Sequence, residues 1–253
     1  METNNNLVLI CGVSAVGKTA SLRKIKNPEG VAYLNCENGK RLPFKSKFLA
    51  GEDGRPGIKI SDPLDIFSMF DAAEEDDSVH TIIIDTATYM MDMYESMYVI
   101  NAVNTMQAWG EYGQFWKTLF RDYIGKSTKS VIMLAHSSDK IDKVTQEVTD
   151  HLVQVKGAIM KIGVESFFTT VIAAKKMTLK QLKKYKNDLL VITDTEEALG
   201  FKYVYQTMLT KATMKERIRA PFEMWSEQET FIDSDVQLVL DRFSEYYEDD
   251  DGF

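Results

Sequence analysis

The sequence predicts an α/β fold built on a doubly wound, mostly parallel sheet. Short apolar runs rich in β-branched residues alternate with helix-compatible stretches, and this alternation is typical of such sheets. The first run, residues 7–11, leads into a glycine-containing loop, and a later run, residues 81–85, ends in an aspartate. No internal repeat interrupts this order.

The loop after the first run has the complete P-loop pattern, in which Gly12 and four further residues precede Gly17, Lys18 and Thr19. An apolar run before it and a helix-compatible stretch after it supply the context that phosphate binding requires. Backbone N–H groups would form an anion site at a helix N-terminus, with Lys18 on the β- and γ-phosphates and the Thr19 hydroxyl on Mg²⁺. The predicted ligands are therefore ATP and Mg²⁺. The predicted nucleotide-binding residues are Gly12, Val13, Ser14, Ala15, Val16, Gly17, Lys18 and Thr19.

The composition is that of an ordinary globular protein, with 253 residues, 44% of them hydrophobic and 27% charged. No apolar run approaches the roughly 20 residues of a membrane span, and the polar N-terminus lacks the basic and apolar regions of a signal peptide. We therefore expect a cytoplasmic protein, in the host cytoplasm if the source is viral, with no membrane partner. Cys11 and Cys36 each end an apolar run and are expected to be reduced core residues.

Apolar runs and helix-compatible stretches continue to alternate between the P-loop and the run that ends at Asp85. Residues 31–35 are predicted to form a buried strand, 39–57 a long basic loop and 58–60 a short third strand. Asp62 and Pro63 have the features of an N-cap and a first helical residue.

After Asp85, the apolar residues of the segment 86–104 do not recur at a regular spacing. Apolar residues then recur at helical spacing over 113–125. Residues 137–157 are polar and too long for a routine connection. Further strands are predicted at 130–135, 167–174 and 203–209. The expected organisation is a core over 1–230 with a lysine-rich insert at about 175–200, a C-terminal helix over 231–244 and a flexible acidic tail over 245–253.

Polar residues follow several of these strands. In open α/β sheets ligands bind at the carboxyl ends of the strands, so Gly12, Glu37, Asp85 and His136 are expected to converge on one site. Asp85 would hold Mg²⁺, directly or through water. Glu37 is the best candidate to orient and deprotonate an attacking water, the alternative being a solvated turn glutamate. His136 would sense the γ-phosphate, although a lone histidine is more often structural.

At these positions the chain resembles the compact RecA-like ATPases of bacterial viruses, known as AAA-type ATPases or single-strand annealing recombinases, which keep the ATPase core without RecA's flanking domains. The resemblance covers roughly residues 5–225. It implies a RecA-like P-loop NTPase core and a catalytic glutamate directly after the second strand, where Glu37 stands. His136 takes the place of a glutamine of RecA. The motifs that carry the resemblance are 12–19, 34–37, 82–86, 134–136, Lys156-Gly157 and 167–175.

By the same resemblance, the segments after Asp85 and His136 correspond to the two DNA-facing loops of RecA, and basic residues near 211–219 would act on a neighbour's ATP. The DNA-binding candidates are Lys140, Lys143, Lys156 and Lys161, together with Lys180, Lys183 and Lys184 of the insert. The trans-acting candidates are Lys211, Lys215, Arg217 and Arg219. For each group the alternative is a solvated basic or mixed-charge surface.

The sequence thus predicts a DNA-stimulated ATPase that binds single-stranded DNA, assembles into a ring or filament, and serves phage recombination, annealing or replication repair. Alternatives are a hexameric helicase or packaging motor, a small-molecule or nucleotide kinase, and an annealing protein that binds ATP without hydrolysing it. The absence of an arginine-rich lid speaks against the kinase. The acidic tail resembles those of RecA and of bacterial single-strand binding proteins, so it is expected to compete with DNA or to recruit a single-strand binding or other replication protein.

Overall fold

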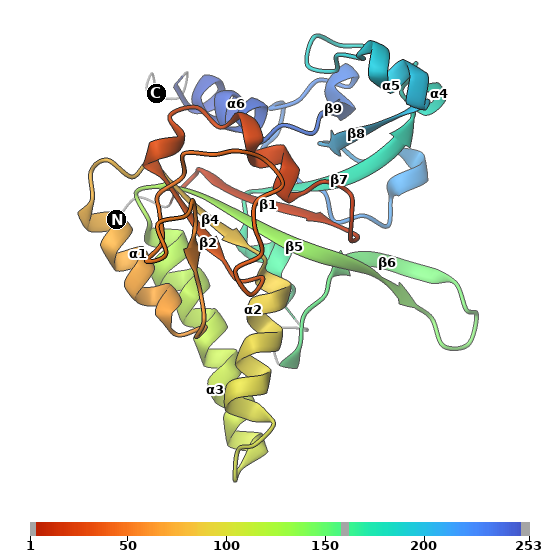
Figure 1. Ribbon diagram of the computed structural model, residues 1–253. Helices are drawn as coiled ribbons and strands as arrows, with labels where there is room; N and C mark the ends of the chain where they lie inside the picture. The colour runs from red at the N-terminus through yellow and green to blue at the C-terminus, as the bar shows by residue number, and fades with distance from the viewer. Residues whose placement is uncertain (1–3, 158–161, 249–253) are drawn as a thin grey trace.

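A computed structural model describes residues 4–157 and 162–248 as one mixed sheet covered by helices on both faces (Figure 1). The strands follow the order β3-β2-β4-β5-β1-β7-β8-β9, and β6 pairs with an extension of β5. Their bounds are β1 (Leu7–Gly12), β2 (Val31–Asn35), β3 (Ile58–Lys59), β4 (Thr81–Asp85), β5 (Ser130–Ile141), β6 (Val148–Val153), β7 (Thr170–Thr178), β8 (Phe201–Gln206) and β9 (Phe231–Asp233).

The centre of the sheet is parallel, because β1 pairs in parallel with both β5 and β7, and β4 pairs in parallel with β2 and β5. The strands β6, β8 and β9 add antiparallel pairings. The register places Gly12 beside His136 and Asn35 beside Asp85, so the carboxyl ends of four strands meet at one edge. The predicted fold class, a doubly wound and mostly parallel α/β sheet, is confirmed.

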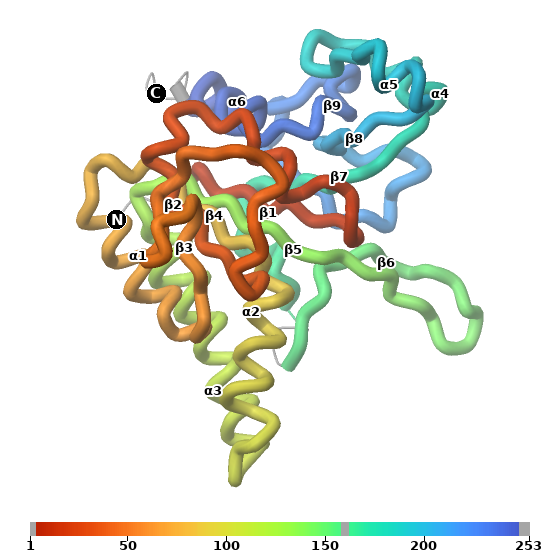
Figure 2. The backbone as a smooth tube through the Cα atoms, viewed as in Figure 1, coloured from red at the N-terminus to blue at the C-terminus, as the bar shows by residue number. Residues whose placement is uncertain are grey.

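The two faces of the sheet are buried by different helices. Helices α1 (Asp65–Glu75), α2 (Ala87–Tyr94) and α3 (Thr105–Thr118) cover one face, where Leu9 packs. The short 3-10 helix η1 (Thr19–Lys24) and α6 (Val236–Glu248) cover the other, where Ile10 packs. Helices α4 (Leu179–Leu182) and α5 (Asp194–Leu199) lie in the connection between β7 and β8, and the tube of Figure 2 shows this connection at the far end of the sheet from α1. Strand residues on both faces are fully buried, as a doubly wound sheet requires.

Several segments differ from the sequence prediction. The helix expected over 113–125 is α3, which begins at Thr105, followed by a π-helical turn over Leu119–Tyr123, and α1 begins at Asp65 with Leu64 as its N-cap instead of Asp62. The P-loop opens onto six residues of 3-10 helix, Thr19–Lys24, in place of a full α-helix, and the chain leaves the helical path at Ile25, whose ψ is 129°. Residues 137–157 are mostly an antiparallel hairpin of β5 and β6, which projects from the body of the molecule (Figure 1). The segment 86–104 contains α2 and a π-helical turn at Glu95–Val99, and the change of helical period accounts for its unclear pattern.

The C-terminal segment also differs. Phe231–Asp233 pairs with β8 as a strand, so the helix expected at 231–244 begins at Val236 and continues to Glu248. Phe231 and Ile232 are buried, and this burial favours the strand over a helix at these two positions. The first four residues of the expected acidic tail therefore belong to α6, and Glu245 pairs with Arg242 at 3.5 Å. Residues 249–253, which carry the rest of that prediction, lie outside the described residues.

Candidate nucleotide-binding site

The P-loop lies between β1 and η1, and two of its glycines are required by the local geometry. A Cβ atom on Gly12 would lie 2.6 Å from the carbonyl oxygen of Ala174 on β7, so only glycine lets the two strands approach this closely. Gly17 has a φ of +84°, a backbone conformation that residues other than glycine rarely adopt. The sequence therefore shapes a tight loop whose backbone can approach a phosphate group.

The Lys18 side chain lies folded across this loop. Its ammonium donates to the carbonyl oxygens of Gly12 at 2.8 Å and Val13 at 2.9 Å. Lys18 is only 6% exposed, and burial lowers its pKa to about 8, although the nearby carboxylate of Asp85 opposes the shift. Two neutral carbonyl oxygens only partly compensate for the cost of burying a positive charge. The loop therefore favours the binding of an anion beside Lys18.

Asp85 ends β4 and is almost completely buried. Its Oδ2 accepts hydrogen bonds from the Thr19 hydroxyl at 2.7 Å and the Tyr33 hydroxyl at 2.7 Å. Burial raises the pKa of Asp85, while these two hydrogen bonds oppose the rise. Its other oxygen, Oδ1, is buried and has no hydrogen-bond partner among the described residues. An unpartnered carboxylate oxygen beside a P-loop hydroxyl fits Mg²⁺, which one or two protein oxygens hold together with phosphates and water.

Glu37 and His136 line the same cavity as the P-loop, a space of about 580 Å³. Glu37 follows β2, its side chain is 14% exposed, and Oε2 lies 3.2 Å from the Lys40 ammonium. His136 lies in β5, where its backbone N–H donates to the Thr88 hydroxyl of α2. Burial and the positive charge of Lys18 lower the pKa of His136, which favours the neutral ring at pH 7. The structure thus brings Lys18, Thr19, Glu37 and His136 to one cavity.

The opposite wall of this cavity comes from β8 and β9, which sequence reasoning did not connect with the site. It includes Lys202 and Tyr203 of β8 and Asp233 of β9. Lys202 is 5% exposed and pairs with Glu196 at 2.6 Å and Asp233 at 3.1 Å, so it fixes the position of both carboxylates. The Tyr203 ring lies beside Gly17 and is 39% exposed. No local motif marks these residues, because only the pairing of β7 with β8 brings them to the P-loop.

Another missed residue, Tyr33, points from β2 to Asp85. Its burial and the Asp85 carboxylate raise the pKa of its hydroxyl, which therefore stays a hydrogen-bond donor. No local sequence signal identifies Tyr33, since its contact with Asp85 depends on the register between β2 and β4.

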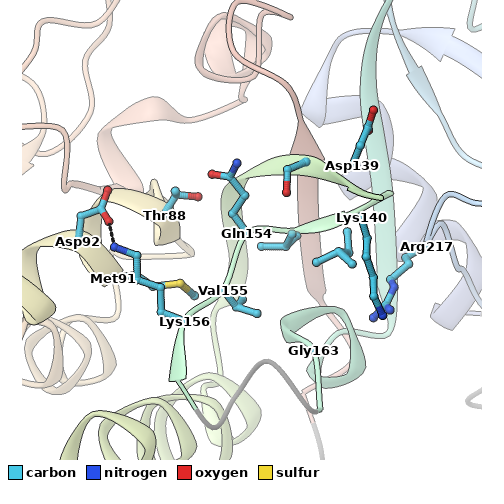
Figure 3. A pocket seen from close by; sticks show the side chains of 13 residues that line it. Thr88, Met91, Asp92, Asp139, Lys140, Gln154, Val155, Lys156, Gly163 and Arg217 are labelled. Atoms are coloured by element: carbon cyan, nitrogen blue, oxygen red, sulfur yellow. Dashed lines mark hydrogen bonds and ion pairs between the residues drawn. The ribbon is translucent and has the colours of Figure 1, made fainter. Parts of the chain in front are cut away.

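A second cavity, of about 450 Å³, lies between α2 and the β5–β6 hairpin (Figure 3). Its lining includes Lys140 and Lys156, which are predicted to bind DNA, and Arg217, which is predicted to act on a neighbour's ATP. Lys156 is held in ion pairs with Asp92 of α2 and with Glu95 of the π-helical turn that follows it. Arg217 makes a two-pronged contact with Asp150 of β6, at 3.1 and 2.9 Å. Both cations therefore already have carboxylate partners in their own chain.

The other predicted basic residues lie apart from this cavity. Lys143 is exposed in the hairpin turn, and the Lys215 ammonium donates to the carbonyl oxygen of Val148. Lys211 and Arg219 are exposed on the segment after β8. Lys180, Lys183, Lys184 and Lys211 line a third space, of about 1110 Å³, beside α4. Lys161 lies outside the described residues.

Comparison with known families agrees with this geometry. Residues 4–175, more than half of the chain, match the AAA domain family. The chain belongs to the AAA domain family. The matched part contains the P-loop, Glu37, Asp85 and His136, and membership indicates a nucleotide-binding ATPase. The β8–β9 wall of the cavity lies beyond the matched residues. The search of curated proteins found no match to the sequence. In the described part of the chain, no helix is both long and apolar enough to cross a bilayer.

The depressed pKa of Lys18 predicts a pH dependence of nucleotide binding. Phosphates favour the charged ammonium, so binding raises the Lys18 pKa above its free value of about 8. Below pH 8 Lys18 is protonated in both states; above it, binding takes up a proton and affinity falls by at most about tenfold per pH unit. Calorimetric titration of ATP at pH 8.5, in two buffers of different ionisation enthalpy, should show this proton uptake. Equal enthalpies in both buffers would show that Lys18 is not the titrating group.

Proposed function

We propose that the protein hydrolyses ATP at the cavity between the P-loop, Glu37 and His136, and that it does so as a RecA-like ATPase. One observation carries the proposal. A phosphate loop, a buried metal-binding carboxylate and a carboxylate suited to activate water line or border a single cavity, although they come from three separate strands. Hydrolysis requires these groups together, whereas binding alone needs only the loop.

The residues at the two ends of the cavity have different roles. The P-loop amides and Lys18 hold the phosphates, and the Tyr203 side of the cavity is the remaining space for the nucleoside. Thr19 and Asp85 would hold Mg²⁺, which would supply neutralisation of charge on the phosphates. Glu37 accepts a proton from the attacking water, and the Lys40 ammonium beside it orients its carboxylate. His136 joins this end of the cavity to α2 through its backbone hydrogen bond to Thr88.

We further propose that single-stranded DNA is the polymer on which this ATPase acts and that copies of the chain assemble side by side. Lys140 and Lys143 on the projecting hairpin, and Lys180, Lys183 and Lys184 beside α4, support the first point, because exposed lysines on protruding elements can reach phosphates. Lys211 and Arg219 support the second, since both are exposed and have no ion-pair partner among the described residues. Arg217 is the weakest trans-acting candidate because Asp150 engages it.

The hydrolytic role of Glu37 is testable by Glu37→Gln. The amide keeps the shape but cannot accept the proton, so turnover should fall by roughly 10²–10⁴-fold while ATP affinity stays within a few-fold. Phosphate release and binding of a fluorescent ATP analogue measure the two quantities separately. Lys18→Ala is the contrasting variant, expected to lose binding and turnover together. A parallel loss of binding and turnover in Glu37→Gln would make Glu37 structural.

DNA stimulation and assembly are testable on the unmodified protein. Phosphate release per chain should rise when an oligothymidylate is added, and should rise with protein concentration across the range in which the chain goes from monomer to oligomer. A cation supplied across an interface is worth roughly 10³–10⁵ in rate in related chemistry. A rate independent of both oligonucleotide and concentration would leave an ATPase that acts alone. Light scattering on the same samples establishes the oligomeric state.

A further inference from the structure

The segment 38–59, which comprises the loop after β2 and the short strand β3, is basic, and apart from Lys40 the ATPase mechanism does not use its cations. Residues 38–59 carry six cations, Lys40, Arg41, Lys45, Lys47, Arg55 and Lys59, against the two acids Glu52 and Asp53. The whole chain has a net charge of −8, so this concentration of positive charge runs against the average composition. An uncompensated basic patch on an acidic protein favours a local polyanion.

The loop is anchored on the core. Phe48 is buried against Tyr33 of β2, with ring centroids 5.8 Å apart, and Phe44 packs edge-on against Phe48 at 6.0 Å. The Leu49 N–H donates to the carbonyl oxygen of Val31 on β2, and the Gly57 N–H donates to that of Leu49. These contacts anchor the backbone that carries the cations, which lowers the entropic cost of binding an extended anion.

The loop encloses a cavity of about 770 Å³ at the carboxyl ends of β2 and β3. Five of the six cations line it, with the half-buried Phe44 among them: Lys40, Arg41, Lys45, Arg55 and Lys59. Lys40 pairs with Glu37, and Arg55 pairs with Asp53 at 3.4 Å. Among the described residues, Arg41, Lys45 and Lys59 have no carboxylate within 4.0 Å. Three exposed cations around one hollow therefore keep their charge available for a ligand.

We propose that this loop cavity binds the phosphodiester backbone of single-stranded nucleic acid. Three observations favour a strand over a single phosphate: the cavity is large, its cations are spread along the loop, and Phe44 offers an aromatic surface for a base. The inference rests on the proposed function and specifies a DNA contact within it. It adds a site on the opposite side of Glu37 from the β5–β6 hairpin and α4.

The position of Lys40 connects this cavity with the nucleotide site. Lys40 lines both cavities, and its ammonium contacts Glu37 at 3.2 Å. Hydrogen bonding to Glu37 raises the pKa of Lys40, so the ammonium remains charged near neutral pH. A phosphate in the loop cavity gives this ammonium a second anion. Nucleic acid bound here therefore alters the surroundings of the residue that activates water.

The triple variant Arg41→Gln, Lys45→Gln, Lys59→Gln tests the site. Its matched control is Lys117→Gln, Arg121→Gln, Lys126→Gln, which removes the same charges from the exposed surface of α3 and the turns that follow it. Anisotropy of a dye-labelled oligothymidylate is measured against salt for both variants and the wild type. Each phosphate contact to a single strand contributes about 0.7 to the salt slope, so the loop variant should lose about 2 from the slope. Its affinity at low salt should fall at least about tenfold, while the control stays within about twofold.

The outcomes separate the two proposals. A loop variant that binds the oligonucleotide like the control, with the same slope, overturns the loop site and leaves single-stranded DNA binding intact. A wild type that binds no oligonucleotide overturns both. If the loop variant loses affinity for inorganic phosphate or pyrophosphate while it binds the oligonucleotide like the control, the site takes small phosphates and the strand assignment is wrong. Circular dichroism melts of both variants verify that the fold is retained.

Discussion

The buried carboxylate of Asp85 is the group on which the geometry of the site depends. It receives hydrogen bonds from Thr19 at the end of the P-loop and from Tyr33 on the neighbouring strand, so three chain segments share one oxygen. Hydrogen bonds to a charged group contribute about 1.5–3 kcal/mol each, which partly offsets the cost of burying the charge. Among residues 4–157 and 162–248, nothing donates a hydrogen bond to the second oxygen of Asp85, so the acceptor capacity of that oxygen stays available. Folding thus fixes the position of the carboxylate that we propose to hold the metal ion.

The parallel sheet extends this constraint outward. Since strands β1, β2, β4 and β5 end at one edge, the P-loop, Glu37, Asp85 and His136 lie together without any long-range motif. The antiparallel strands β8 and β9 then close the opposite side of the cavity, with Lys202 holding Glu196 and Asp233 in place. The basic loop after β2 leaves from the same edge and shares Lys40 with the nucleotide cavity. One sheet edge therefore carries both the proposed ATP hydrolysis and the proposed nucleic-acid contact.

Much of this arrangement is predictable from sequence because parallel strands are continuous apolar runs and the P-loop is a local motif. The strands containing Leu9, Tyr33, Ile83 and Ile132 lie where their apolar runs predict. The sequence does not predict the β5–β6 hairpin. Within the hairpin its strands are polar and solvated over most of their length, so apolar and polar residues do not alternate as they do in a half-buried strand. Tyr33, Lys202 and Tyr203 could not be assigned, since strand register alone brings them to the site. The pairing of Lys156 and Arg217 with acids of their own chain is likewise a tertiary property.

The most direct test of the metal-binding role of Asp85 is the Mg²⁺ dependence of ATP affinity in Asp85→Asn. The amide can still accept hydrogen bonds from Thr19 and Tyr33 through its oxygen, but it loses the charge that faces the metal. Calorimetric titration with ATP, with Mg²⁺ and then with a chelator, should show that Mg²⁺ strengthens binding to the wild type and has little effect on the variant. A variant that gains as much affinity from Mg²⁺ as the wild type would show that Asp85 does not hold the metal and would contradict the account.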